Sequence, residues 1–383
     1  MIAARQIAFG KAAGKKEEQP AYWGLCFTAE EAGSTVAMST SATNPPAVTL
    51  ETSFDGDVWE PFTVGETVIT LPSVGDKVYF RAGEGGNLRF AFAINSFSPI
   101  KYNFFVLTGR ISASGSINSL LNGLEETVSL NTYAFASLFV RCSSLTTAPE
   151  LPATTLAKHC YRSMFNGCTS LAQAPELPAT TLDTSCYASM FNGCTSLAQA
   201  PGLPATTSAA HCYSNMFKDC TSLAQAPELP ATTLADYCYT NMFNGCTSLA
   251  QAPELPATTL AVHCYDYMFN GCTSLAQAPE LPATTLAINC YSNMFKGCTS
   301  LAQAPELPAT TLATRCYFNM FKDCINIDCI DCSFEAFDAG TSDWLSNVSP
   351  IGTFICPTAL GTNETIQRGA SYCPEGWTVI NKD

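Results

Sequence analysis

One 26-residue unit recurs without a register shift through the middle of this 383-residue chain. From Cys142 to Asp323 the sequence reads close to CTSLAQAPELPATTLAxxCYxxMFxG, seven times in succession. Repetition at a fixed period of this length is typical of stacked repeats, in which each unit buries its apolar face against its neighbours. An array of this kind usually presents an extended surface that binds a partner, so the repeat already favours binding over catalysis.

The sequence predicts a multidomain chain, with an all-β sandwich followed by an α/β solenoid. Residues 1–20 form a flexible tail, 21–115 the β-sandwich and 116–323 the solenoid, with an amino-terminal cap at 116–141 and the seven repeats at 142–323. Residues 324–383 form the C-terminal cap. Strands are expected where β-branched and aromatic residues cluster between turn residues, at Thr35–Met38, Val48–Glu51, Thr67–Leu71, Lys77–Phe80 and Phe104–Leu107.

Each repeat is predicted to contain one helix and one strand. Positions are counted here from the first cysteine of each copy. Positions 15 to 24 carry apolar residues at i, i+4, i+5, i+8 and i+9, which predicts a helix of two to three turns; in the copy beginning at Cys168 they are Leu182, Cys186, Tyr187, Met190 and Phe191. The extended part, Thr-Ser-Leu-Ala-Gln-Ala-Pro, predicts a short strand that ends near the proline, which cannot donate to a sheet.

Both ends of the array have a predicted cap, as solenoids require. Residues Asn131 to Arg141 match the helical half of the repeat, with Ala134 in place of the second cysteine and Phe135 in place of the tyrosine. After Cys324 the pattern dissolves, and we expect a strand, a helix around Trp344 and a further strand.

Charge and motifs exclude several classes of function. The formal charge of −14 argues against binding of nucleic acid or of an anionic membrane, and no segment is long and apolar enough to predict membrane insertion. No nucleophile elbow or phosphate-binding glycine loop occurs, so we expect no enzymatic activity and no cofactor. The first 20 residues lack the apolar core of a signal peptide, and export by an amino-terminal signal is not expected.

Fifteen of the twenty cysteines fall at two fixed positions of the repeat. Cysteines locked to a repeat are more often small buried side chains than disulfide partners, which favours reduced thiols over disulfides. Beyond the repeats, packed thiols, a disulfide and a zinc site all remain open for the C-terminal group, which consists of Cys324, Cys329, Cys332, Cys356 and Cys373.

The copies differ chiefly at positions 16–18, 21–22 and 25–26, and these columns hold the candidate binding residues. The three histidines all occupy position 18 in alternate copies, about 10 Å apart at sheet spacing, which is too far for two of them to share a metal. Variation there reflects either drift on a solvent face or diversification of a binding face. The candidates, called here the variable stripe, are His159, Arg162, His211, Tyr237, His263, Asp266, Tyr267, Asn289, Arg315 and Phe318.

Position 9 forms an acidic row that only Gly202 interrupts. Like charges at sheet spacing repel one another, so the row is expected to be a solvated ridge. Calcium or a basic partner is the alternative, although one carboxylate per copy supplies few of the six to eight oxygens that calcium takes. The row consists of Glu150, Glu176, Glu228, Glu254, Glu280 and Glu306.

The repeat resembles that of the BspA-like leucine-rich-repeat surface proteins of gut and oral Bacteroidetes and their mobile elements. The unit Met-Phe-x-Gly-Cys-Thr-Ser-Leu, as at residues 190–197, carries the resemblance, and the Ala-Pro-Glu-Leu-Pro-Ala-Thr-Thr-Leu stretch supports it. It covers about residues 131–354. The resemblance implies a leucine-rich-repeat solenoid with a non-enzymatic role at an exterior surface, in adhesion to host cells, matrix proteins or other microbes.

The absence of a signal peptide favours a phage virion fibre or decoration protein within this resemblance, because a virion protein is released by lysis. The tail and β-domain would attach the chain to the virion or to a cell-surface assembly, and the repeats would bind a host surface glycan or protein. A homo-oligomer such as a trimer is compatible with this role. The alternative is a secreted bacterial cell-surface adhesin of the BspA-like type.

Overall fold

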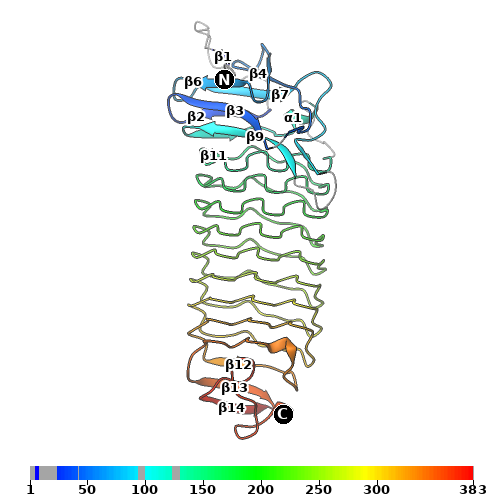
Figure 1. Ribbon diagram of the computed structural model, residues 1–383, viewed down its shortest axis with the longest axis vertical. Coiled ribbons are helices and arrows are strands. Elements are labelled where there is room, and N and C mark those ends of the chain that lie inside the picture. Colours follow the sequence, from blue (N-terminus) through cyan, green and yellow to red (C-terminus); the bar gives the residue numbers. More distant parts are fainter. Residues whose placement is uncertain (1–4, 8–23, 42, 94–99, 123–129, 383) are drawn as a thin grey trace.

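The computed structural model describes residues 5–7, 24–41, 43–93, 100–122 and 130–382. This part of the chain is mostly β-structure and turns, and its sheets do not close into a barrel. Its one α-helix, α1 (Ser119–Asn122), has four residues. Figure 1 shows an elongated molecule with the N-terminal sheets at one end, stacked coils in the middle and a small sheet at the other end.

Two sheets of the N-terminal part face each other through phenylalanine rings. Phe27 of one sheet and Phe105 of the other lie 4.9 Å apart, centroid to centroid. The first sheet has the order β1 (Arg5–Ile7), β6 (Thr67–Leu71), β3 (Ser34–Thr40), β9 (Lys101–Thr108), β8 (Ala91–Phe92). The second has the order β11 (Leu145–Thr147), β10 (Ile111–Ser114), β2 (Cys26–Ala29), β7 (Lys77–Ala82), β4 (Leu50–Ser53), β5 (Glu60–Phe62).

All five predicted strand segments of the N-terminal part coincide with or overlap observed strands, namely β3, β4, β6, β7 and β9. The predicted flexible tail is wrong for Arg5–Ile7, because these residues form β1 and pair in parallel with β6. Residues 8–20 of that predicted tail lie outside the described residues.

Each 26-residue copy forms one coil that lies on the next. Over positions 18 to 26 the backbone N–H groups alternate between two kinds of partner. The N–H of Tyr161 donates to the carbonyl of Cys186 in the following coil, at 3.0 Å, whereas the N–H of Arg162 donates to His159 three residues back, at 3.2 Å. Of the nine bonds in this coil, five therefore join neighbouring coils and four close local turns.

The predicted helix in each repeat is wrong. Positions 18, 22 and 26 have left-handed backbone in every coil, as at His159 (φ 58°), Ser163 (φ 55°) and Gly167 (φ 76°). An α-helix cannot contain a left-handed residue every four positions. The apolar residues repeat in pairs every four residues, and this period belongs to a series of turns, although over ten residues it resembles the 3.6-residue period of a helix.

The predicted strand is present in the first copy only, as β11. In later copies it shrinks to single bridges at position 6, such as the parallel bridge between Gln173 and Gln199. Prolines at positions 8 and 11 cannot donate to a ladder, which explains why pairing stops there.

Aromatic rings form two ladders through the core of the coils. Tyr161 and Tyr187 are stacked at 5.9 Å, and Phe165 and Phe191 at 5.6 Å, and both patterns continue from coil to coil. These rings are almost completely buried, so each contributes a large apolar area to the core.

The residues assigned to the amino-terminal cap continue both ladders, as their equivalence to the repeat predicts. Phe135 stacks on Tyr161 at 5.9 Å and Phe139 on Phe165 at 5.4 Å. On its other side Phe139 packs against Phe105 of β9 at 5.2 Å. The N-terminal sheets and the coils therefore share one apolar core.

The C-terminal end is covered by three parallel strands, β12 (Cys329–Asp331), β13 (Gly352–Pro357) and β14 (Trp377–Lys382). The predicted flanking strands are confirmed, but the predicted helix around Trp344 is wrong. The segment contains the short 3-10 helix η1 (Ala339–Thr341) followed by turns, and a second, η2 (Thr358–Leu360), lies after β13. Trp344 is buried and ends the tyrosine ladder, 6.2 Å from Tyr317.

Candidate binding surface

Position 18 of the variable stripe forms a ladder of stacked rings. The rings of His211 and Tyr237 lie 4.6 Å apart, those of Tyr237 and His263 lie 4.6 Å apart, and Tyr133 stacks on His159 at the same distance. Ser185 interrupts the series between its two stretches. The structure thus brings three predicted residues, from three successive coils, into one continuous ladder.

The backbone at this ladder is unfavourable for the side chains that it carries. His211, Tyr237 and His263 have φ values of 56°, 60° and 55°. Left-handed backbone costs a residue with a Cβ on the order of 1–2 kcal/mol, a cost that glycine avoids. Position 26 also has a positive φ, and it carries glycine in five of the seven copies, whereas position 18 never does. Position 18 therefore carries a histidine or tyrosine ring in four of the seven copies, although glycine would suit the backbone better.

His263, Asp266 and Asn289 form a hydrogen-bonded group beside the ladder. Nδ1 of His263 lies 2.8 Å from Oδ2 of Asp266, and Nδ2 of Asn289 lies 3.1 Å from Nε2 of the same ring. Asp266 is only 8 % exposed, and burial raises the pKa of its carboxyl against the opposing effect of His263. The group at Nε2 is an amide and not a nucleophile, so this arrangement orients the imidazole without forming a catalytic triad.

Of the remaining stripe residues, His159 and Arg162 lie toward one end, Arg315 and Phe318 lie toward the other, and Tyr267 lies beside Asp266. Burial, with Arg162 as the next cause, lowers the pKa of His159 to about 4. In the last coil the guanidinium of Arg315 lies over the ring of Phe318, 4.0 Å from its centroid. Burial raises the pKa of the Tyr267 hydroxyl, and the nearby carboxylate of Asp266 raises it further. The stripe is thus a lengthwise surface and not one convergent pocket.

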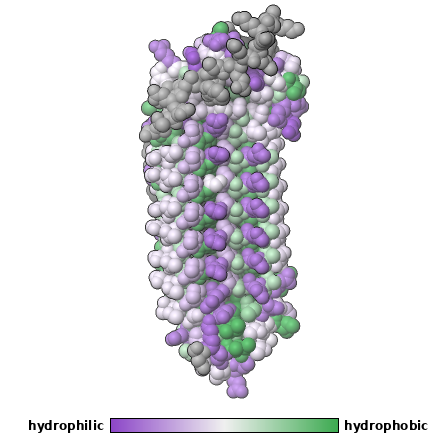
Figure 2. All heavy atoms as spheres, turned by 180° about the vertical axis from the view of Figure 1, so that it is seen from behind, coloured by the Kyte–Doolittle hydropathy of each residue, from purple (hydrophilic) through white to green (hydrophobic). Residues whose placement is uncertain are grey.

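All six glutamates of the acidic row are exposed, as a solvated ridge requires. Figure 2 shows one face of the molecule on which hydrophilic rows run lengthwise beside less polar rows. Among the described residues no group of three or more His, Cys, Asp or Glu side chains is arranged to hold a metal.

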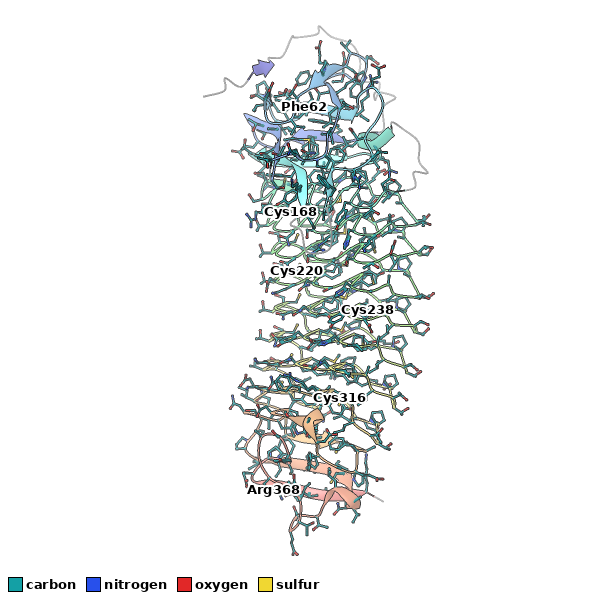
Figure 3. The ribbon with its side chains drawn as sticks, turned by 45° about the vertical axis from the view of Figure 1, so that its right-hand side comes forward. Phe62, Cys168, Cys220, Cys238, Cys316 and Arg368 are labelled. Atoms are coloured by element: carbon teal, nitrogen blue, oxygen red, sulfur yellow. The ribbon has the colours of Figure 1, made fainter. Side chains whose placement is uncertain are left out.

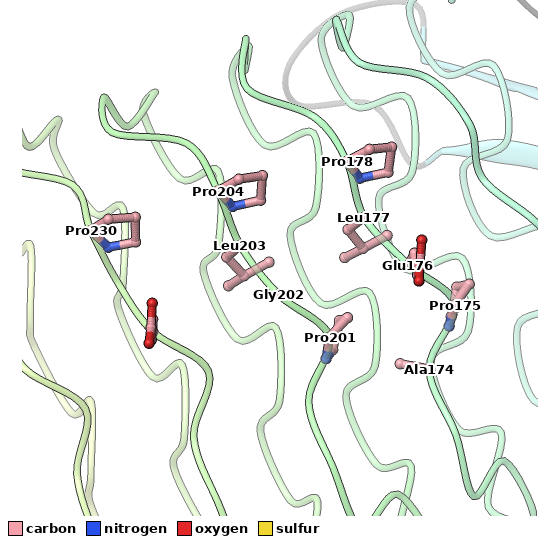
Figure 4. A pocket seen from close by; sticks show the side chains of 11 residues that line it. Ala174, Pro175, Glu176, Leu177, Pro178, Pro201, Gly202, Leu203, Pro204 and Pro230 are labelled. Carbon is pink, nitrogen blue, oxygen red and sulfur yellow. The ribbon is translucent and has the colours of Figure 1, made fainter.

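Sequence reasoning missed a series of grooves beside the acidic row. Each groove lies between the Ala-Pro-Glu-Leu-Pro segments of neighbouring coils, and the one at Gly202 has a volume of about 530 Å³. Figure 4 shows Pro175, Leu177 and Pro178 on the segment of one coil. Pro201, Leu203 and Pro204 lie on the segment of the next coil. The spacing of the two prolines was the signal in the sequence, because neither can donate a backbone hydrogen bond to an adjacent coil.

The repeat cysteines are free thiols with a structural role. Figure 3 places Cys168 and Cys220 of the first series and Cys238 and Cys316 of the second within the stacked coils. Thiols of the first series donate to a phenylalanine carbonyl of the preceding coil, as from Cys168 to Phe139 at 3.0 Å. Burial raises the pKa of Cys238 to about 11 and that of Cys186 to about 12, so these thiols stay protonated at neutral pH.

The C-terminal cysteines are also free thiols, and all but Cys329 are buried. The guanidinium of Arg368 lies 3.1 Å from Sγ of Cys373 and also donates to three backbone carbonyls. This side chain ties the last loops together around the thiol, which gives Cys373 a packing role in the cap.

No protein-family model, curated protein or solved structure matches the chain. Within the part of the chain that the structure describes, no helix is long and apolar enough to cross a membrane.

Proposed function

We propose that this chain is a non-enzymatic binding protein of an exterior surface, and that the variable stripe is its recognition surface. The observation that carries the proposal is the ring ladder at position 18, where histidine and tyrosine replace the glycine that the backbone favours. A side chain that makes the left-handed backbone less favourable than glycine would is expected to contribute through its contacts. Because these rings stack face to face on one another, they present their polar edges to a ligand, and such edges are suited to hydrogen bonding and to protein interfaces.

The fold that supports this function is, in our proposal, a leucine-rich-repeat solenoid that lacks helices. Its support is the coil-to-coil hydrogen bonding, the two aromatic ladders and the buried leucines at positions 4 and 10, such as Leu171 and Leu177. Stacked coils present the stripe as a straight column, so a long ligand can contact several copies at once. Repeated weak contacts along one ligand raise the apparent affinity without new chemistry.

Within this class, a phage virion fibre or decoration protein is our preferred assignment, with the N-terminal sheets attached to the particle and the stripe bound to a host surface glycan or protein. Proteomics of particles together with immunogold microscopy tests this assignment. Detection on the particle exterior supports the virion role. Detection only on bacterial envelopes would favour the secreted adhesin instead.

The recognition surface is tested by binding of the purified chain to host cells and to a glycan array. The double variant His211→Ser with Tyr237→Ser places a residue that Ser185 already shows to be compatible with this position. We expect binding to fall at least about tenfold, as for the removal of two central aromatic contacts. Gln251→Ala, an exposed change in another part of the coil, is the matched control. Equal binding by all three proteins would contradict the proposal.

A further inference from the structure

The Ala-Pro-Glu-Leu-Pro segments form a second surface, separate from the variable stripe. In the copies that begin at Cys168, Cys194, Cys220, Cys246 and Cys272, no backbone hydrogen bond joins neighbouring coils across positions 7 to 12. The coils are bridged before this segment at the position-6 glutamines and, in some pairs, after it at position 14. Two prolines per segment remove the donors that would close the gap. Grooves with rigid walls therefore remain between the Ala-Pro-Glu-Leu-Pro segments of neighbouring coils.

The groove at Gly202 differs from the others. Four grooves have volumes of about 360 to 460 Å³, and the two glutamates of each come from adjacent coils, whereas those of the groove at Gly202, Glu176 and Glu228, are two coils apart. The groove at Gly202 has about 530 Å³ and extends over three coils, from Ala174 to Pro230. The missing carboxylate side chain leaves a wider socket, lined mainly by proline and leucine.

The backbone does not require glycine at position 202. Its φ is not in the left-handed region, and a Cβ added there would meet no atom within 4 Å. The other six copies carry glutamate at this position. Gly202 therefore creates the socket without serving the fold, and the socket is a local feature that a single side chain would fill.

Glu176 and Glu228 flank the socket on either side. Both line the same groove, both are exposed, and the structure gives neither an ion pair among the described residues. They are two coils apart, about 10 Å at sheet spacing. Every second side chain of an extended segment lies on one face, so cations at i and i+4 flank an apolar residue at i+2 and span about 13 Å, which is within the reach of long Lys or Arg side chains. An apolar socket between two unpaired carboxylates is complementary to an apolar side chain between two cations.

We propose that this socket docks an extended segment of a partner protein, with an apolar side chain inserted at Gly202 and Lys or Arg residues paired with Glu176 and Glu228. The rigid proline walls are formed before binding, so little ordering is needed when the segment enters. The formal charge of −14 attracts a basic partner and raises its association rate. This docking surface is independent of the ring ladder at position 18.

The test measures the binding of fluorescent peptides by anisotropy at two salt concentrations. The probe contains Lys-Thr-Leu-Thr-Lys between Gly-Ser flanks, which places both lysines and the leucine on one face, and the control peptides replace its leucine with serine or both lysines with glutamate. We expect Gly202→Glu to weaken binding of the probe at least about tenfold by filling the socket. We expect Glu280→Gly, flanked by Glu254 and Glu306, to create a second socket that shares no carboxylate with the first and to double the stoichiometry.

A loss of binding by Gly202→Glu cannot be attributed to misfolding, because the new side chain enters open space and restores the sequence of the other copies. Equal thermal unfolding of both variants and the parent checks this point. Binding that needs both the leucine and the lysines, and that Gly202→Glu removes, supports the proposal. Three results would overturn it: no binding of the probe, equal binding of the serine peptide, or binding that Gly202→Glu leaves intact or strengthens. The last two would indicate simple adsorption of cations to the acidic row.

Discussion

The ring of His211 lies parallel to that of Tyr237, with centroids 4.6 Å apart and planes 8° apart, although both residues have left-handed backbone. The ladder is therefore part of the stability of the coils as well as a surface. Stacked aromatic pairs contribute about 0.5–1.5 kcal/mol each beyond the area that they bury. A change at Tyr237 removes two such contacts, because its ring also stacks on His263.

Substitutions at Tyr237 distinguish a left-handed turn from a helix. We expect Tyr237→Ala to lower the free energy of unfolding by about 1–3 kcal/mol through the loss of two stacked pairs. We expect Tyr237→Gly to be about 1 kcal/mol more stable than Tyr237→Ala, because glycine relieves the left-handed backbone. Urea unfolding of both variants measures the difference. In a helix the order would be reversed, so a more stable alanine variant would contradict the turn.

The sequence predicted the repeat, the β-rich N-terminal part and the equivalence of the cap residues, because these depend on patterns that recur or alternate. It did not reveal the left-handed positions. Glycine at positions such as Gly193 indicated one of them. Position 18 carries His211 and Tyr237, and although histidine is enriched at positive φ, most histidines do not adopt it and tyrosine gives no such signal. Pairs of apolar residues four apart also fit a short helix almost as well as a series of turns.

The candidate site was predictable only in part. Columns of variable residues identified the stripe, but stacking between Tyr237 and its neighbours depends on the turn geometry that the sequence did not reveal. The groove at Gly202 was missed because its shape depends on the absence of bonds between coils over the proline segment. A substitution of glutamate by glycine in one copy was visible, but its consequence was not.

Two glycines at position 26 give a matched test of the backbone. We expect Gly271→Ala to cost about 1–2 kcal/mol, since its φ is 71° and a Cβ there makes only an ordinary contact. Gly245→Ala should cost more, because its Cβ would overlap the Oδ1 atom of Asp219. Denaturant unfolding compares the two variants.

The double variant Gly245→Ala with Asp219→Gly isolates the overlap. Removal of the Asp219 side chain should return the cost of the alanine to that of Gly271→Ala, and a double-mutant cycle gives the coupling. Equal stability of the two single variants would show that the Asp219 carboxylate turns aside without cost and would contradict the predicted coupling.

Acidification should weaken the fold through His159. Burial and the nearby Arg162 and Lys158 lower the pKa of its imidazole to about 4 from 6.5, with Asp183 opposing and His211 adding to the shift. The unfolded chain therefore binds the proton first, and the free energy of unfolding falls as the pH drops from about 6.5 to about 4. The pKa of Asp266 is raised, which acts in the opposite direction.

The variant His159→Asn removes this titration and uses a residue that position 18 already carries at Asn289. We expect the loss of stability between pH 7 and pH 4.5 to be smaller in the variant than in the parent. Gln251→Asn, an exposed change without a titrating group, should leave the pH dependence unchanged. An identical pH profile for His159→Asn and the parent would show that this histidine does not titrate in the range.

The number of reactive thiols should differ strongly between the folded and the unfolded chain. Burial raises the pKa of Cys194 and Cys246 to about 12, and Cys329 is the one cysteine that is not buried. In the native protein at pH 8, we expect a thiol reagent to modify no cysteine other than Cys329. The other thiols are buried and protonated, so little reactive thiolate is accessible to the reagent. In guanidinium without reductant, all twenty thiols should react. Fewer reactive thiols after unfolding would reveal disulfides, and fast reaction of many thiols in the native state would show that the coils open readily.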